Sequence, residues 1–302
     1  MIKIQHPRLT DICNSYTDYI VCRNKKLKNN RYIEYVFTPE RLRHIVACPA
    51  DRLHDIITDF NSYFSVINTN STEWNEFCKY MINLYKSVRN EYLPQILHEL
   101  NLSVCPYCNR QYIFTVNNGR RVSAQFDHFY SKTKYPYLAL SFYNLIPCCP
   151  VCNKAKGERI IDINPYLEGF ENECTIQIDS PLNCIFQNGD WGICIKGEKK
   201  HKKNIETFVL DKLYEKHKDY AMEIVFKEIA HEKGYLDTIK KEFMNIGVSD
   251  DLINRILFNY DTNTDNPKRP LSKMTNDIIK QIKDYLLKYG FQVPPTKNPS
   301  NF

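Results

Sequence analysis

Two Cys-x-x-Cys pairs constrain this chain more than any other feature. The first pair is Cys105 and Cys108, and the second is Cys149 and Cys152. Each pair points two sulfurs at one ion across a tight turn, and two such turns supply the four soft ligands that tetrahedral zinc prefers. The spacing therefore predicts a structural Zn²⁺ ion that anchors the segment between the pairs as one closed loop.

The other cysteines indicate the compartment. The chain has 12 cysteines, and the eight outside the pairs lack this spacing and are predicted to be small buried hydrophobes. Cys148 leaves open which of two adjacent sulfurs is the ligand, although the spacing favours Cys149. Since no N-terminal apolar segment with a cleavage site is apparent, we expect a reducing cytoplasm rather than a secreted disulfide framework.

Length and charge leave several possibilities open. With 302 residues the chain can form one large domain or two smaller ones, and we predict two. No stretch approaches about 18 consecutive apolar residues, so no membrane association is expected. The net charge of +6 suits a polyanionic partner, but many soluble enzymes carry as much. Charge alone therefore does not indicate nucleic acid.

The apolar pattern predicts an α+β fold with three regions. Residues 1–104 read as a helical region that serves packing or partner docking, with a helix beginning at Thr38-Pro39. A helical run from Glu73 to Leu100 carries an apolar stripe, and Pro94 is expected to end or kink it. Residues 105–165 are predicted to form the functional core. Residues 166–302 are predicted to be mainly helical with one β-hairpin.

The core is predicted to contain two short strands and one helix. Residues 111–116 alternate, Asn117-Asn118-Gly119 suits a turn, and residues 122–128 form the next strand, which together indicate a hairpin. After a break at residues 147–150, a short polar helix is expected from Val151 to Gly157. Tyr137 lies in the intervening loop, where packing is favoured over stacking on a base.

Further elements are expected after the core. Residues 174–196 are predicted to form a hairpin around Asn188-Gly189, and residues 204–260 are predicted to be helical. Lys199 to Lys203 is a basic run that reads as a solvated linker or as a phosphate contact. A last helix is expected from Ser272 to Tyr289, followed by a loose tail after Gly290.

Between the cysteine pairs lie an aspartate–histidine pair and two asparagines: Asp127, His128, Asn144 and Asn153, the last directly after Cys152. This pattern resembles the HNH endonucleases, and the resemblance covers about residues 105 to 160. It implies a ββα-metal nuclease core with a four-Cys zinc knuckle pair. Because Asn153 stands where the family often has histidine, the chain resembles an HNN variant, which bears on metal preference.

The chemistry of each residue suits the role that the resemblance implies. His128 has a side chain with an unperturbed pKa near neutrality and would be the general base. Asp127 and Asn153 offer hard oxygens suited to a catalytic Mg²⁺ or Mn²⁺. Asn144 can fix a backbone group or the imidazole orientation. Because neighbours on a strand point to opposite faces, Asp127 and His128 are expected to share a site only at a strand end or irregularity.

Basic residues follow the last proposed metal ligand. Lys154, Lys156 and Arg159 are predicted to contact nucleic-acid phosphates, although exposed lysines on a short helix are commonly only solubilising. The framework also fits a zinc ribbon that binds nucleic acid without cutting it. An enzyme and a binding module therefore both remain in view.

The fuller strings at residues 126–136, 144–145 and 149–157 resemble HNH nucleases of bacterial anti-phage defence, most closely the Septu-type and retron-associated proteins. The resemblance implies an SMC- or ABC-like ATPase partner, metal-dependent phosphodiester hydrolysis, and DNA as the first substrate. RNA, including tRNA, is the second, because nothing in residues 105–160 is recognisable as a reader of a 2′-hydroxyl.

Overall fold

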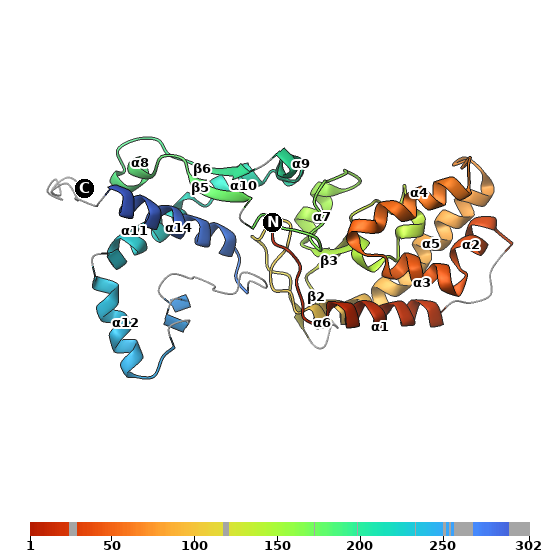
Figure 1. The fold of residues 1–302 in the computed structure, drawn as a ribbon, viewed down its shortest axis with the longest axis horizontal. Coiled ribbons are helices and arrows are strands. Elements are labelled where there is room, and N and C mark those ends of the chain that lie inside the picture. The colour runs from red at the N-terminus through yellow and green to blue at the C-terminus, as the bar shows by residue number, and fades with distance from the viewer. Residues whose placement is uncertain are drawn as a thin grey trace. The chain divides into compact units, whose positions relative to one another are not determined.

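The computed structural model describes residues 1–23, 29–116, 121–171, 173–197, 199–232, 234–249, 252–253, 255–256 and 268–289. It is a mostly helical α+β structure with small two-stranded sheets (Figure 1). Its contacts form two compact units. The first comprises residues 1–174, 197–210 and 263–271, and the second comprises residues 175–196, 211–262 and 272–302.

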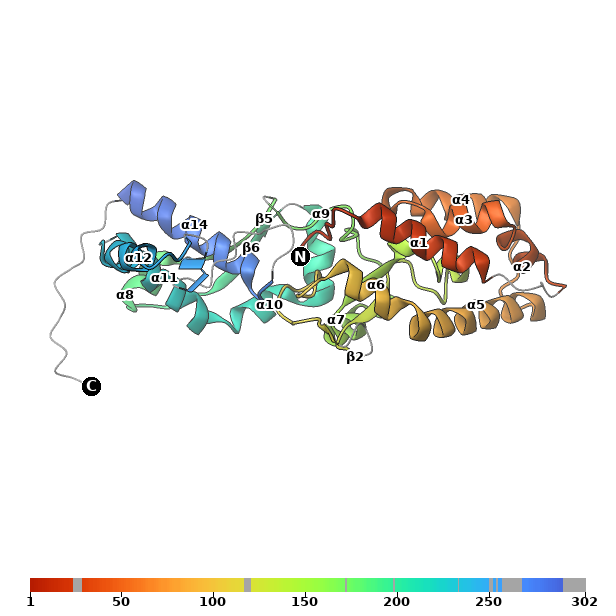
Figure 2. The same cartoon turned by 90° about the horizontal axis from the view of Figure 1, so that it is seen from below.

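The first unit begins with six helices. They are α1 (Leu9–Cys22), α2 (Arg31–Val36), α3 (Pro39–Ala47), α4 (Leu53–Tyr63), α5 (Thr72–Glu91) and α6 (Leu93–Leu100), all visible in Figures 1 and 2. The predicted start of α3 is confirmed, because the Thr38 hydroxyl accepts a hydrogen bond from the Arg41 amide. Contacts group these helices with residues 105–165 in one compact unit.

The long predicted helix is divided at Tyr92, two residues before Pro94. Proline lacks an amide hydrogen and is best tolerated in the first turn of a helix. A new helix, α6, therefore begins at Leu93 with Pro94 in its first turn. On α5 the buried stripe is Trp74, Phe77, Met81, Tyr85 and Val88.

Aromatic side chains join the helices to the loop between the two core strands. The Tyr137 ring stacks on the Phe60 ring of α4, with centroids 3.9 Å apart. Phe60 in turn packs beside Tyr32 of α2 and Phe77 of α5. Tyr137 is buried, so the packing role predicted for it is confirmed.

The core strands are β3 (Gln125–His128) and β4 (Leu145–Cys148), which pair antiparallel, followed by helix α7 (Pro150–Lys156), which contacts β3. Asp127 pairs with Ile146, and His128 pairs with Leu145. Before them, β1 (Thr115–Val116) pairs with β2 (Arg121–Val122). The predicted hairpin is thus reduced to the short pair β1–β2, and the predicted strand over residues 122–128 was wrong in its pairing, because residues 125–128 pair with β4. The predicted turn at residues 117–119 lies outside the described residues.

The predicted linker at Lys199 to Lys203 is instead the start of helix α9 (Lys199–Phe208). Lys200 forms ion pairs with Glu168 and Glu173, and Lys203 pairs with Asp162. The His201 side chain is buried. These pairings order the run as a helix of the first unit, so the expectation of a solvated linker was wrong.

The second unit contains α8 (Pro181–Phe186), α11 (Lys218–Glu232), α12 (Tyr235–Asn245), α14 (Ser272–Tyr289) and the two-stranded sheet β5 (Cys174–Ile178) with β6 (Ile193–Gly197); α10 (Leu210–Glu215) leads into it. Helix α14 has the bounds predicted for it.

The predicted simple hairpin at residues 174–196 was wrong in its connection. Ser180-Pro181 begins helix α8 between the two strands, because proline suits the first turn of a helix. Among the described residues, no helix is long and apolar enough to cross a membrane. The predicted tail after Gly290 lies outside the described residues.

Candidate functional site

Four cysteines from two segments converge in the first unit. The Sγ atoms of Cys105, Cys108, Cys149 and Cys152 all lie within 4.8 Å of one another, and all four residues are buried. Backbone amides donate to the sulfurs: Cys149 N lies 3.3 Å from Cys105 Sγ, and Cys152 N lies 3.4 Å from Cys149 Sγ. Amides directed at sulfur stabilise thiolates, so the cluster is fit to hold a structural Zn²⁺ ion.

Cys148 is not part of this cluster. It is the last residue of β4, where it pairs with Gln125, and burial raises its thiol pKa well above the ordinary value. Cys149 instead caps the start of α7. The spacing argument therefore selected the correct sulfur.

Asp127 is a buried carboxylate with two protein donors. The Tyr107 hydroxyl donates to its Oδ2 at 2.8 Å, and the Lys156 Nζ lies 3.2 Å from the same oxygen. Burial raises the Asp127 pKa to about 6, although Lys156 and the Tyr107 hydrogen bond act in the opposite direction. The ammonium and hydroxyl thus offset part of the desolvation of this carboxylate.

Lys156 does not occupy the surface position predicted for it. Its side chain is fully buried, and its Nζ donates to the Asp127 carboxylate and, at 2.6 Å, to the His128 carbonyl oxygen. A lysine at the end of α7 that faces β3 has a buried carboxylate as its partner, which explains why it turns inward. Lys154 and Arg159 are exposed, as predicted, and Arg159 donates to the Ala155 carbonyl.

His128 is the last residue of β3 and is 4 % exposed. Its Nε2 lies 3.1 Å from the Ala139 carbonyl oxygen, which can only accept, so Nε2 carries the hydrogen and Nδ1 keeps a lone pair. Its ring packs edge-on against the Tyr85 ring at 4.5 Å. Burial, followed by the nearby Lys132 charge, lowers the His128 pKa to about 3. The imidazole is therefore neutral at pH 7.

Asn144 fixes the backbone of the loop between β3 and β4. Its Oδ1 accepts from the Tyr130 amide at 2.7 Å, and its Nδ2 donates to the carbonyls of Tyr130 and Leu138. Leu138 directly precedes Ala139, whose carbonyl oxygen accepts the hydrogen bond from the His128 ring. Two roles were predicted for the Asn144 amide, fixing a backbone group or orienting the imidazole, and in the structure it binds backbone groups.

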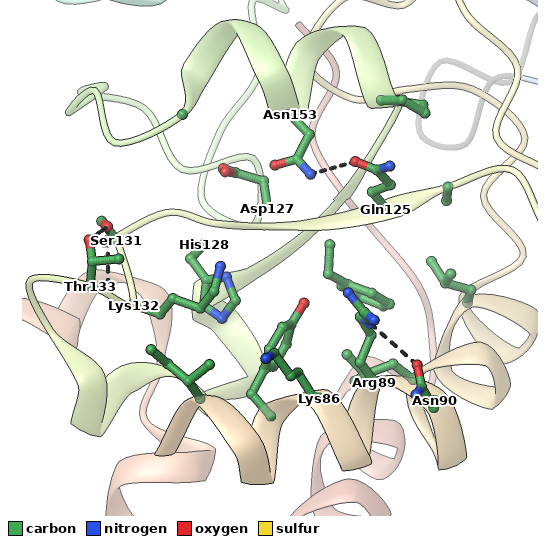
Figure 3. A pocket seen from close by; sticks show the side chains of 18 of the residues that line it. Lys86, Arg89, Asn90, Gln125, Asp127, His128, Ser131, Lys132, Thr133 and Asn153 are labelled. Atoms are coloured by element: carbon green, nitrogen blue, oxygen red, sulfur yellow. Dashed lines mark hydrogen bonds between the residues drawn. The ribbon is translucent and has the colours of Figure 1, made fainter. Parts of the chain in front are cut away.

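Asn153 lies on α7, where its Nδ2 donates to Gln125 Oε1 at 2.6 Å. Figure 3 shows Asp127 and Asn153 on the α7 side of β3 and His128 on the side that faces α5. Asp127 and His128 thus keep the opposite directions of strand neighbours. They nevertheless line one cleft of about 830 Å³, together with Asn153.

The far wall of this cleft was not predicted from the sequence. Lys86, Arg89 and Asn90 of α5 line it, as does Lys132 from the loop after β3 (Figure 3). A signal for the α5 residues was present, because positions 86, 89 and 90 follow helical spacing and share one face. It went unused because the N-terminal helices carried no recognisable motif.

Comparisons with protein-family models, with curated proteins and with solved structures found no match.

Proposed function

We propose that this protein is a metal-dependent nuclease of the HNH type that hydrolyses the phosphodiester bonds of nucleic acid, with DNA as the first substrate class. In this proposal β3, β4 and α7 are its ββα-metal core. The observation that carries the proposal is the meeting of Asp127, His128 and Asn153 in one cleft, on two strands and a helix that the four-cysteine cluster ties together.

His128 would act as the general base. Its Nδ1 keeps the lone pair because Nε2 donates to the Ala139 carbonyl. A water molecule that attacks phosphorus would give its proton to Nδ1. A ring with a pKa of about 3 is a weak base, but a phosphodiester bound in the cleft brings negative charge beside it and raises that pKa.

Asp127 and Asn153 would hold a divalent metal ion. Their carboxylate and amide oxygens are hard donors, and Figure 3 shows both on one side of β3, so the donor chemistry fits Mg²⁺ or Mn²⁺. Such an ion, when bound, stabilises charge on the phosphoryl and leaving oxygens. The hydrogen bond to Gln125 orients the Asn153 amide, and Tyr107 orients the Asp127 carboxylate.

Asn144 would be a positioning residue. It holds the Tyr130 and Leu138 backbone groups, and the loop that these residues belong to carries the Ala139 carbonyl that orients His128. The amide does not need to reach the substrate to matter, since it keeps the base in one tautomer and one direction.

The resemblance at residues 126–136 and 149–157 supports a narrower proposal. We place the protein as the nuclease of a bacterial anti-phage defence system in the cytoplasm, working with an SMC- or ABC-like ATPase. The same core can accept an RNA backbone, so tRNA is the second substrate class.

The test compares three proteins: the wild type, His128→Ala, and His98→Ala as a matched control on an exposed face of α6. Each is incubated with plasmid DNA and with total tRNA, in Mg²⁺, in Mn²⁺ and in EDTA. We expect metal-dependent cutting by the wild type and the His98 variant, and its loss in the His128 variant. Zinc content is measured in parallel, because a variant that loses zinc has lost its core. Equal cutting by all three proteins would contradict the proposal.

One observation favours a second candidate, a zinc module that binds nucleic acid without cutting it. The Asp127 carboxylate already has the Lys156 ammonium as a partner, which can substitute for a metal ion. If the protein is such a module, the wild type and His128→Ala would bind nucleic acid equally well. Neither protein would cut DNA or tRNA, even with the ATPase added.

A further inference from the structure

The cleft has a wall that does not belong to the proposed ββα core. Lys86, Arg89 and Asn90 come from α5 and face the same cleft as His128 and Asn153 (Figure 3). They occupy one helical stripe beside the buried stripe that contains Tyr85 and Val88. Packing of the buried stripe therefore fixes the direction in which the polar stripe points.

The two cations of this polar stripe have no acidic partner among the described residues. Lys86 and Arg89 are both exposed, and neither forms an ion pair there. Arg89 Nε donates to the neighbouring Asn90 Oδ1 at 3.4 Å. Elsewhere in this unit cations do find carboxylates: Arg23 pairs with Glu91 at the end of the same helix, and Arg31 pairs with Glu73 near its start.

Lys132 adds a third cation from the loop after β3. Its Nζ lies 5.5 Å from the centroid of the Tyr85 ring, and burial lowers its pKa. It forms no ion pair with another described residue. A half-buried ammonium without a carboxylate gains from an anionic ligand, because that ligand restores the interactions that desolvation removed.

The acids of the cleft are already engaged. Asp127 has Lys156 as its partner, and Glu158 accepts a hydrogen bond from the Thr133 hydroxyl at 2.6 Å. They therefore leave the three cations available for an anion from outside. Exposed lysine and arginine side chains are the groups that contact phosphates in nucleic-acid complexes.

We propose that the polar stripe of α5, Lys86, Arg89 and Asn90, together with Lys132, is the binding surface for the phosphodiester backbone of the substrate strand. This inference rests on the proposed function, which it deepens by assigning substrate binding to a helix outside the core. It also replaces Lys156 of the predicted phosphate contacts, since that side chain is buried. Binding through phosphates is independent of base sequence and falls steeply with salt.

The experiment measures binding without cleavage. Fluorescence anisotropy with the full chain, in buffer without Mg²⁺ or Mn²⁺, follows a labelled DNA duplex and an RNA of the same sequence. The test variant is the double substitution Lys86→Glu with Arg89→Glu. The matched control reverses the same number of charges at exposed lysines outside the cleft, Lys79→Glu with Lys280→Glu. Thermal unfolding and zinc content confirm that both proteins are folded, and Lys86→Ala with Arg89→Ala serves as a milder pair.

We expect the test variant to bind about tenfold or more weakly at low salt, and the slope of log K against log salt to shrink by about two, since each lost phosphate contact removes about 0.9 from it. The control should stay within about twofold of the wild type. A loss confined to DNA or to RNA would support the inference and name the substrate. Test and control variants that bind alike would overturn it.

The two proposals can fail separately. If the wild type never cuts but binding depends on Lys86 and Arg89, the nuclease proposal fails and the binding surface stands. If cutting depends on His128 but the test variant binds and cuts like the control, the nuclease stands and the surface assigned to α5 is wrong.

Discussion

Within the described part of the chain, charged side chains are buried and paired on one side of β3, and exposed and unpaired on the other. On the α7 side the Asp127 carboxylate, the Lys156 ammonium and the Tyr107 hydroxyl are buried and bound to one another. On the α5 side Lys86 and Arg89 are exposed and form no ion pair among the described residues. Charges of the first kind are expected to matter for stability, and charges of the second kind for binding.

The difference follows from the cost of burial. Burying an ion destabilises the folded state unless an opposite charge and hydrogen bonds compensate its lost hydration. The charged groups on the α7 side must therefore find their partners within the protein. Exposed cations keep their water and pay little for having no partner. The cations on the α5 side can therefore stay unpaired until an external anion binds. Substitutions on the α7 side should lower stability, and substitutions on the α5 side should weaken binding.

The largest effect is expected at the four-cysteine cluster, which anchors α7 to the rest of the α7 side. Cys152→Ser removes one of the four sulfurs that can hold Zn²⁺, and zinc binding in such sites contributes about 10–16 kcal/mol to folding. We expect loss of zinc and of the folded core, measured by metal analysis and thermal unfolding. Cys148→Ala is the matched control, because this buried thiol lies outside the cluster; it should keep its zinc.

The next effect is expected at the buried ion pair. Lys156→Met leaves the Asp127 carboxylate without its ammonium, and breaking a buried pair costs about 3–5 kcal/mol. Chemical unfolding of this variant beside Lys154→Met, an exposed neighbour on the same helix, measures the difference. If both variants were equally stable, the buried pair on the α7 side would not contribute to stability as described.

A smaller effect is expected at the loop that holds His128. Asn144→Ala leaves the Tyr130 amide and the Leu138 carbonyl without their partner, and one unsatisfied buried group costs about 1–3 kcal/mol. Asn153→Ala removes a partly exposed side chain and should change stability by less than about 0.5 kcal/mol. Unfolding measurements should therefore separate Asn144 from Asn153, while cleavage assays should show a loss for both.

The cysteine cluster and helix α7 could be predicted from sequence, because ligand spacing and turn residues are local signals. The pairing of β3 with β4 could not, since residues 122–128 were expected to pair with residues 111–116 across a short turn. The buried position of the Lys156 side chain could not be predicted, since its partner Asp127 lies 29 positions away and only the fold brings them together. The α5 wall was missed for a related reason. Spacing shows that Lys86, Arg89 and Asn90 share a face, but not that this face lies opposite β3 across the cleft.

The smallest effect concerns the neutral imidazole of His128, which lies on the α5 side of β3. The folded protein holds His128 unprotonated, with a pKa near 3, while the unfolded chain binds a proton below about pH 6.5. His128 therefore costs stability progressively as the pH falls below about 6.5, by up to about 1.4 kcal/mol per pH unit.

The His128→Ala variant lacks this titrating group, while the raised pKa of Asp127 affects both proteins. The difference in stability between the two proteins therefore isolates the contribution of His128. Urea unfolding at about pH 7 and about pH 5.5 should show the wild type losing stability relative to the variant. Zinc content is checked at each pH, because thiolates release metal in acid. A difference independent of pH would mean that the ring is solvated and that the α5 side is more open than the structure has it.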